Sequence, residues 1–219
     1  MNIGILGSGT VGRTLGTGFR AHGHEVTIGG RDPAKPEAVA WASSHGAVSA
    51  GYAEAAEAGD ILVNATPGAA SLGVLAQVGD DRLGSKVLLD VSNALDFSAG
   101  FPPSLAVPHH DSMGEMIQRA HPGLRVVKAL NTVNASVMVN PERVGSGIHD
   151  IFVAGEDVGA KAQVSDLLAE LGWRRERIRD LGGIRASRGL EMYLPLWLEL
   201  MGALGTAEFN IRLVGSNDA

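Results

Sequence analysis

Three glycines near the start of the chain, Gly7, Gly9 and Gly12, have the spacing that suits a dinucleotide pyrophosphate. An apolar run over residues 3–6 precedes them, and a glycine-rich stretch that favours a helix follows. In such a unit the first glycine permits a tight turn, the second lets the backbone approach the phosphates, and the third lets helix and strand pack closely. The free N–H groups that begin the helix add positive potential. The pattern predicts a phosphate-binding turn.

The end of the second expected strand, residues 25–29, distinguishes between two dinucleotides. An NAD site places Asp or Glu here, where the carboxylate accepts hydrogen bonds from ribose hydroxyls. This chain has Gly30 and Arg31 instead. Glycine leaves room, and a guanidinium pairs with a phosphate through two parallel hydrogen bonds. We therefore predict a site that prefers NADP, with its 2′-phosphate, and that binds NADPH much more tightly than NADH.

The residues that follow Arg31 give weaker signals. Asp32 stands one position too late to bind the ribose, so we expect it to point elsewhere and to cap a helix whose first residue is Pro33. Lys35 either adds a second positive charge to the phosphate site or is simply solvated.

The elements that must position these residues alternate between apolar strands and helices, which is typical of an α/β, doubly wound and mostly parallel sheet. We expect residues 1–155 to form an NADP-binding Rossmann domain and residues 156–219 a small C-terminal, mainly helical part. Residues 184–213 are a long, mostly apolar helical stretch that Pro195 interrupts, so we expect two helices or one kinked helix. The apolar side of this stretch, which includes Phe209, is either core or a dimer face. Further strands are expected at 47–48, 60–65, 86–91, 124–129, 150–154 and 177–181, and helices at 34–45, 52–58, 69–79 and 157–171.

The composition excludes several classes of function. The 219 residues carry a net charge of −6, which argues against nucleic acid as a partner. The absence of cysteine excludes disulfides, thiolate metal sites and a cysteine nucleophile. No apolar stretch reaches the length of a membrane span, and Met1 leads directly into a strand without a signal peptide. We expect a cytoplasmic protein.

Polar residues stand where three of the expected strands end: Thr66, Asn93 and Asn131. Ligands of open α/β sheets bind outside this carboxyl edge, so these side chains are candidate contacts. The sequence offers no catalytic triad, and hydride transfer between stacked rings depends on orientation more than on acid–base catalysis. The irregular residues 94–111 form a loop of a length that is typically functional or mobile.

Lys128 has two interpretations. Burial at the end of an apolar strand would lower its pKa and suit a catalytic role. Alternatively it is structural and pairs with a carboxylate such as Asp90. The neighbouring His109 and His110 point in different directions on an extended chain, and with Asp111 they make a poor chelate, so we expect no metal site.

Several motifs occur in a characteristic order: Gly7–Gly12 with Gly30-Arg31, then LDVSN at 89–93, VVKALNTV at 126–133, and Leu194-Pro195-Leu196. Together they resemble the family of NADPH-dependent reductases of the deazaflavin coenzyme F-420 (also written F420), and the related cytosolic domains of membrane ferric reductases. The resemblance covers nearly the whole chain. It implies a cleft between the Rossmann domain and the helical part, where the deazaflavin ring stacks on the nicotinamide. Members are commonly dimers.

The resemblance also implies roles for individual residues. Ser8 to Val11 would contact the pyrophosphate and ribose, and Gly30, Arg31 and Lys35 the 2′-phosphate. The full set of cofactor-binding candidates is Gly7, Ser8, Gly9, Thr10, Val11, Gly12, Gly30, Arg31, Lys35, Thr66, Pro67, Ser92, Asn93 and Ala135. Candidates for the acceptor cleft are Asn131, Asn134 and Trp197, of which Trp197 also suits simple packing. A flavin, a quinone or another small acceptor, and a non-catalytic NADP-binding sensor, stay open as alternatives.

Overall fold

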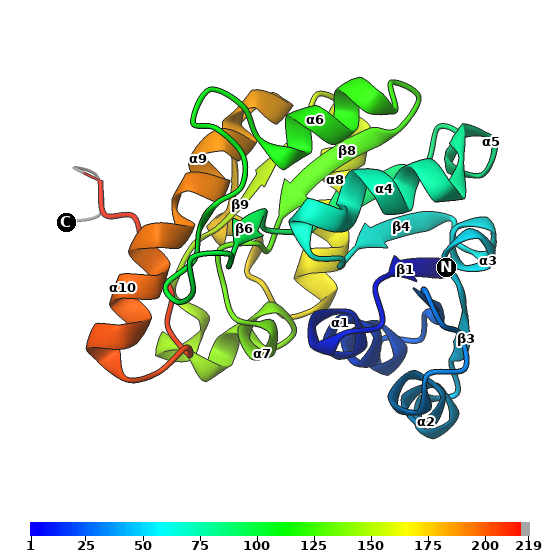
Figure 1. Cartoon of the computed structure of the whole chain (residues 1–219). Helices are drawn as coiled ribbons and strands as arrows, with labels where there is room; N and C mark the ends of the chain where they lie inside the picture. The colour runs from blue at the N-terminus through cyan, green and yellow to red at the C-terminus, as the bar shows by residue number, and fades with distance from the viewer. Residues whose placement is uncertain (216–219) are drawn as a thin grey trace.

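The computed structural model describes residues 1–215, and within them eight strands form one sheet (Figure 1). Neighbouring strands run parallel except β8 and β9, which pair antiparallel. The expected α/β, doubly wound and mostly parallel fold is confirmed. In sheet order the strands are β10 (Ile178–Asp180), β9 (Ile151–Ala154), β8 (Arg125–Ala129), β5 (Val87–Asp90), β4 (Ile61–Asn64), β1 (Asn2–Leu6), β2 (Glu25–Gly30) and β3 (Val48–Gly51).

Helices cover both faces of the sheet, because the central strands are apolar on both sides. Side chains from α1, α2, α7 and α8 form the core on one face, and those from α3, α4, α5 and α6 form the core on the other. The helices are α1 (Thr10–Ala21), α2 (Pro36–His45), α3 (Tyr52–Ala58), α4 (Gly68–Val78), α5 (Asp80–Leu83), α6 (Met113–Ala120), α7 (Ala135–Met138), α8 (Val158–Glu170), α9 (Ser187–Met192) and α10 (Leu194–Leu204), with short 3-10 turns at Pro141–Arg143, Gly145–Gly147, Arg175–Arg177 and Ile184–Ala186.

Strand order reverses between β1 and β4. The chain proceeds outward from β1 through β2 to β3, then crosses back to β4 on the other side of β1. In open α/β sheets this switch point leaves a crevice at the carboxyl ends of the strands, where ligands bind. The turn that follows β1 and the segment that follows β4 therefore face one another across the expected nucleotide site.

The C-terminal region forms two helices, one of the two arrangements expected for residues 184–213, but the helical part ends earlier than expected. Pro195 lies in the first turn of α10, where its missing N–H is tolerated, so α9 and α10 are separate helices (orange in Figure 1). Helix α10 ends at Leu204 with Gly205 in the left-handed conformation, so Phe209 lies beyond it. The sheet also continues past the domain boundary expected at residue 155, because β10 pairs with β9.

Two helices differ in detail from what the sequence predicted. Helix α2 begins at Pro36, and Asp32 closes a turn by accepting a hydrogen bond from the backbone N–H of Ala34 at 2.9 Å instead of capping a helix at Pro33. Helix α6 was not expected at all. The side chain of Ser112 caps it by accepting from the Glu115 N–H. The loop over 94–111 contains a small hairpin, β6 (Leu95–Asp96) with β7 (Ser104–Leu105).

Candidate functional site

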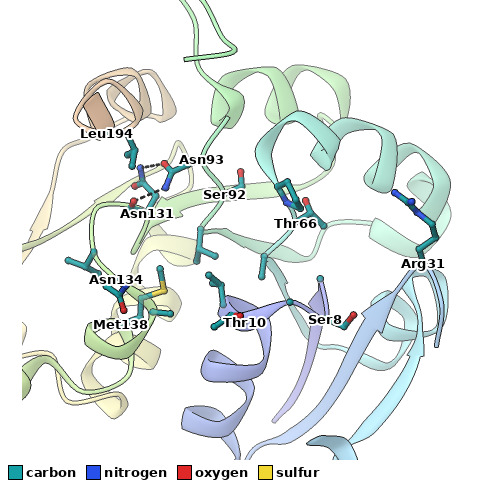
Figure 2. A pocket seen from close by; sticks show the side chains of 18 of the residues that line it. Ser8, Thr10, Arg31, Thr66, Ser92, Asn93, Asn131, Asn134, Met138 and Leu194 are labelled. Atoms are coloured by element: carbon teal, nitrogen blue, oxygen red, sulfur yellow. Dashed lines mark hydrogen bonds between the residues drawn. The ribbon is translucent and has the colours of Figure 1, made fainter. Parts of the chain in front are cut away.

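A cavity of about 700 Å³ lies at the carboxyl ends of the central strands, and it extends from Arg31 to Trp197. Figure 2 shows Arg31 at one side, Leu194, Asn131 and Asn93 at the other, and Thr66 and Ser92 between them. The residues that line it are Gly7, Ser8, Gly9, Thr10, Val11, Arg31, Asp32, Lys35, Tyr52, Ala65, Thr66, Pro67, Val91, Ser92, Asn93, Asn131, Val133, Asn134, Ala135, Met138, Leu194 and Trp197.

The turn after β1 is shaped by three glycines with different constraints. Gly7 has φ +124°, and a Cβ there would collide with the backbone of Ala65. A Cβ on Gly12 would collide with the carbonyl oxygen of Gly7. A Cβ on Gly9 would meet no described heavy atom within 4 Å, because Gly9 faces the cavity. Gly7 and Gly12 therefore build the turn, and Gly9 keeps its inner surface open for a ligand.

Helix α1 begins at this turn without a side-chain cap, since Gly9 is its N-cap residue. Its first N–H groups are therefore available to an anion in the cavity. The guanidinium of Arg13 donates to the Ser8 carbonyl oxygen at 2.7 Å and holds the turn in place. The lining residues Ser8 to Val11 thus form a cradle for phosphate oxygens.

The β2 end of the cavity carries two positive side chains. Arg31 is exposed and makes no hydrogen bond or ion pair with any other residue in the range 1–215. Lys35 makes a loose ion pair with Glu37, with Nζ and carboxylate oxygen 3.8 Å apart. Gly30 lies just outside the lining, where a Cβ would crowd the Ser8 hydroxyl at 2.9 Å. The end of β2 thus offers an unpaired guanidinium next to the phosphate cradle.

A buried polar network supports the middle of the cavity. The Thr66 hydroxyl donates to Asn64 Oδ1 at 2.7 Å, and Asn64 Nδ2 donates to Asp90 Oδ1 at 2.8 Å. The Ser71 hydroxyl contacts both Asn64 and Thr66. Since these partners come from the end of β4, the end of β5 and helix α4, the network fixes the segments that follow β4 and β5 relative to one another.

At the far end, two asparagines join strands β5 and β8 (dashed lines in Figure 2). Asn93 Nδ2 donates to the Asn131 carbonyl oxygen at 2.8 Å, and Asn131 Nδ2 donates to Asn93 Oδ1 at 3.0 Å. Asn131 Nδ2 also donates to the Leu190 carbonyl oxygen at 3.0 Å. Asn134 caps α7 through its side-chain oxygen, which accepts from the Ser136 N–H.

Three polar atoms at this end are buried without a partner among the described residues: Ser92 Oγ, Asn131 Oδ1 and Trp197 Nε1. Their residues all line the cavity. Trp197 stacks on Phe209 with ring centroids 5.3 Å apart. Buried polar groups are normally satisfied, so unpartnered ones that border a cavity point to a ligand with complementary polar groups.

Lys128 lies beneath the cavity and outside its lining. Its side chain is fully buried, and Nζ lies 2.8 Å from Asp90 Oδ2 and 2.9 Å from Glu191 Oε1. Burial lowers the pKa of this ammonium, but the two carboxylates more than offset that effect, so its pKa lies above the ordinary value. The structural interpretation, with Asp90 as the partner, is the one that the geometry supports.

The site residues predicted from the sequence and the residues that line the cavity differ at a few positions. Gly12 and Gly30 lie outside the lining and act by packing, while Asp32, expected to point elsewhere, is part of it. The lining residues that were not predicted as site residues are Tyr52, Ala65, Val91, Met138 and Leu194. Hydrophobic residues that line a site and those that fill a core look alike in sequence. Among the residues described, no cluster of His, Asp and Glu could hold a metal ion.

Comparisons with known proteins identify relatives by sequence and by structure. A sequence model of the family "NADP oxidoreductase coenzyme F420-dependent" matches residues 2–94. A crystal structure designated as an F420-dependent NADP reductase from Arthrobacter sp. FB24 is 47% identical, with a TM-score of 0.94 over 98% of this chain and 100% of that one. The metalloreductase STEAP3 of Rattus norvegicus is 27% identical over 201 residues, which is 89% of this chain but 37% of STEAP3.

A reductive aminase from Aspergillus terreus, solved with NADPH and ethyl levulinate, shares the fold at 20% identity, with a TM-score of 0.66 over 93% of this chain and 62% of that one.

Within residues 1–215, the helices are too short or too polar to cross a membrane.

The fold and the site define a Rossmann-type oxidoreductase that uses NADP. The chain belongs to the family of coenzyme F420-dependent NADP oxidoreductases.

Proposed function

We propose that this enzyme transfers hydride between NADP(H) and a deazaflavin, coenzyme F420. The observation that carries the proposal is the length of the cavity. It begins at an unpaired guanidinium and a phosphate cradle, and it continues past Ser92 and Asn131 to an indole on α10. A dinucleotide site alone would not need the wall formed by Leu194 and Trp197.

We propose that the glycine turn and its flanks bind the adenosine and pyrophosphate half of the cofactor. Backbone N–H groups of Ser8 to Val11 would hold the pyrophosphate, and Arg31 with Lys35 would hold the 2′-phosphate. Thr66 and Pro67 would flank the cofactor at the switch point. Tyr52 borders the same half of the cavity and would pack against the adenosine.

We propose that the other half of the cofactor lies along Ser92, Asn93 and Asn131, with Ala135 nearby. When bound, NADPH supplies a hydride from its nicotinamide ring. The chain's own contribution is orientation, since the unpartnered Ser92 Oγ and Asn131 Oδ1 can bind polar groups of the cofactor and fix its ring. No side chain needs to move a proton, which agrees with the placement of Lys128 outside the cavity.

Three observations support coenzyme F420 as the proposed acceptor. The family model and the Arthrobacter relative are both described by coenzyme F420. Trp197, half-buried and stacked on Phe209, offers a rigid aromatic surface to a planar ring. The aliphatic side chain of Leu194 and the thioether of Met138 provide apolar contacts nearby.

A flavin, a quinone or another small acceptor is the alternative within the same enzyme class, and STEAP3 is described as a metalloreductase. A non-catalytic NADP-binding sensor is disfavoured by the family and by the continuation of the cavity beyond Asn131. Stopped-flow kinetics with NADPH and equal concentrations of F420, FMN and a soluble quinone would test the choice. We expect fast absorbance loss with F420. Turnover with FMN or the quinone alone would contradict it.

We also propose a homodimer in which the apolar side of α9 and α10 is the shared face, within a C-terminal part that completes the acceptor cleft. Met192, Leu196 and Leu204 are large, apolar and exposed on these helices. Sedimentation of the wild-type chain should give twice the monomer mass, and Leu196→Glu should give monomers. A monomeric wild-type chain at micromolar concentration would contradict this.

A further inference from the structure

Three charged side chains are buried together beneath the floor of the cavity: Lys128, Asp90 and Glu191. Lys128 Nζ lies 2.8 Å from Asp90 Oδ2 and 2.9 Å from Glu191 Oε1. Lys128 and Asp90 are 0% exposed and Glu191 is 5% exposed. They come from β8, from β5 and from α9, so the cluster joins two neighbouring strands of the sheet to the C-terminal helices.

Both carboxylates have further donors, so the cluster is well satisfied. Asp90 Oδ1 accepts from Asn64 Nδ2 at 2.8 Å and from the Ser92 N–H at 3.1 Å. Glu191 accepts from the N–H groups of Met113 at 2.8 Å and Gly114 at 3.1 Å, at the start of α6. The positive end of α6 and the lysine together balance the two negative charges.

The cluster reaches both walls of the cavity's far end through hydrogen bonds. Lys128 Nζ donates to the carbonyl oxygen of Ser92 at 2.6 Å, and Asp90 accepts from the same residue's N–H. The Ser92 backbone is therefore held on both sides, while its hydroxyl, at the cavity, has no partner in the described part of the chain. On the opposite wall, Glu191 lies three residues before Leu194, and its neighbour Leu190 accepts from Asn131.

Stability alone does not explain this arrangement. Buried ion pairs are often no better for stability than apolar side chains of similar volume, because desolvation offsets the attraction. What a charged cluster provides is a defined geometry, since each group must face its partners. Here that geometry fixes Ser92 relative to α9, and with it the two sides between which the proposed nicotinamide and acceptor would lie.

We propose that Lys128 is a positioning residue, which acts through Ser92, Asp90 and Glu191 to hold the nicotinamide half of the site in shape without touching the cofactor. This inference rests on the proposed function only in requiring NADPH as a ligand. It predicts that loss of the ammonium weakens binding of the nicotinamide half and leaves the adenosine half intact.

The test compares two ligands by calorimetry: NADPH, and adenosine 2′,5′-bisphosphate, which lacks the nicotinamide half. Lys128→Met should weaken NADPH about tenfold, equivalent to about 1.4 kcal/mol, with less than a twofold change for the bisphosphate. Lys161→Met is the matched control. Lys161 is also buried and bonds a carboxylate, Asp180, and a carbonyl, Gly182, but lies outside the cavity lining. It should leave both affinities unchanged.

Glu191→Gln provides a second variant, since it keeps the Lys128–Asp90 pair. If Lys128→Met does not fold, the same comparison of NADPH affinity with bisphosphate affinity can be made on Glu191→Gln. It should weaken NADPH about threefold and spare the bisphosphate. Equal losses for both ligands would assign Lys128 to folding alone, and an unchanged NADPH affinity would exclude any role in positioning. If the wild-type chain bound neither ligand, the proposed function would fail first and the inference with it.

Discussion

The two ends of the cavity carry different kinds of polar group: an exposed charge at one end and buried neutral atoms at the other. At the β2 end, Arg31 is exposed and has no hydrogen-bond or ion-pair partner among the described residues, so it offers a full charge in contact with water. At the α10 end, Ser92 Oγ and Asn131 Oδ1 are buried neutral dipoles that find no hydrogen-bond partner within residues 1–215. A charge on the surface attracts a phosphate and selects it over a hydroxyl. Buried dipoles penalise any ligand that leaves them unsatisfied. We infer that the first end chooses the cofactor and the second sets the geometry for the acceptor.

The largest effect should come from Gly9→Val. The new side chain would extend into the cavity where the cradle must approach phosphate oxygens, so the protein should fold normally and lose about a hundredfold in NADPH affinity, the equivalent of one or two charge-assisted hydrogen bonds. Gly12→Val is the contrasting control. Its side chain would meet the Gly7 carbonyl, and we expect a loss of about 3 kcal/mol in unfolding free energy. Calorimetric titration and thermal denaturation measure both. A stable Gly12→Val chain would contradict the described turn.

Arg31→Ala should act only at the β2 end. Removal of the guanidinium should weaken NADPH by about 1.5–3 kcal/mol, as expected for a charge-assisted contact with the 2′-phosphate, and should spare NADH. Fluorescence titration with both cofactors measures the difference. If both affinities fell equally, Arg31 would serve the fold instead of the phosphate.

Trp197→Ala should act only at the α10 end. Loss of the indole removes an aromatic surface from the acceptor side, so kcat/KM for the acceptor should fall about tenfold while the NADPH affinity stays within twofold. Trp197→Phe is the conservative control and should retain most of the activity. A loss of NADPH affinity equal to the loss of kcat/KM would remove the distinction between the two ends.

The smallest effect should come from Glu115→Gln, away from both ends. Hydrogen bonds from Arg188 lower the pKa of the Glu115 carboxyl, burial opposes this, and Ser112 adds to it. The charged form therefore stabilises the fold above the unfolded pKa of about 4.5, and this stabilisation is lost as the pH falls through the lower folded value. The variant should cost about 1 kcal/mol at pH 7.

Thermal denaturation between pH 3 and pH 7 checks that last expectation. The difference in Tm between wild type and Glu115→Gln should shrink in acid, and both ligand affinities should match those of the wild type. A pH-independent difference would show that the charge of Glu115 is not the cause.

The same contrast explains what the sequence could predict. The β2 end is built from residues close together in the chain, so glycine spacing and the identity of Arg31 were enough to predict where this end of the cavity lies. The alternation of apolar strands with helices also predicted the mostly parallel sheet. The α10 end depends on contacts across long separations, such as Lys128 with Glu191 and Asn131 with Leu190. No local pattern encodes those pairs, so Glu191 was missed even though Asp90 was named.

Helix boundaries failed for a related reason. Asp followed by Pro is typical of a helix start, but here Asp32 closes a turn and α2 begins at Pro36. Gly205 ends α10, although apolar residues continue beyond it to Phe209. Helix α6 has a short hydrophobic face, but its start carries a sequence signal that was overlooked, because Ser112 and Glu115 have the Ser-x-x-Glu spacing of a capping box. The antiparallel pairing of β8 with β9 has no signal within either strand.

The measurement that tests the central claim most directly is a parallel titration of the wild-type chain with NADPH and NADH, followed by cofactor fluorescence at constant ionic strength. An unpaired Arg31 beside the glycine cradle predicts that NADPH binds at least about tenfold more tightly, the equivalent of 1.4 kcal/mol. Equal affinities for the two cofactors would contradict the account.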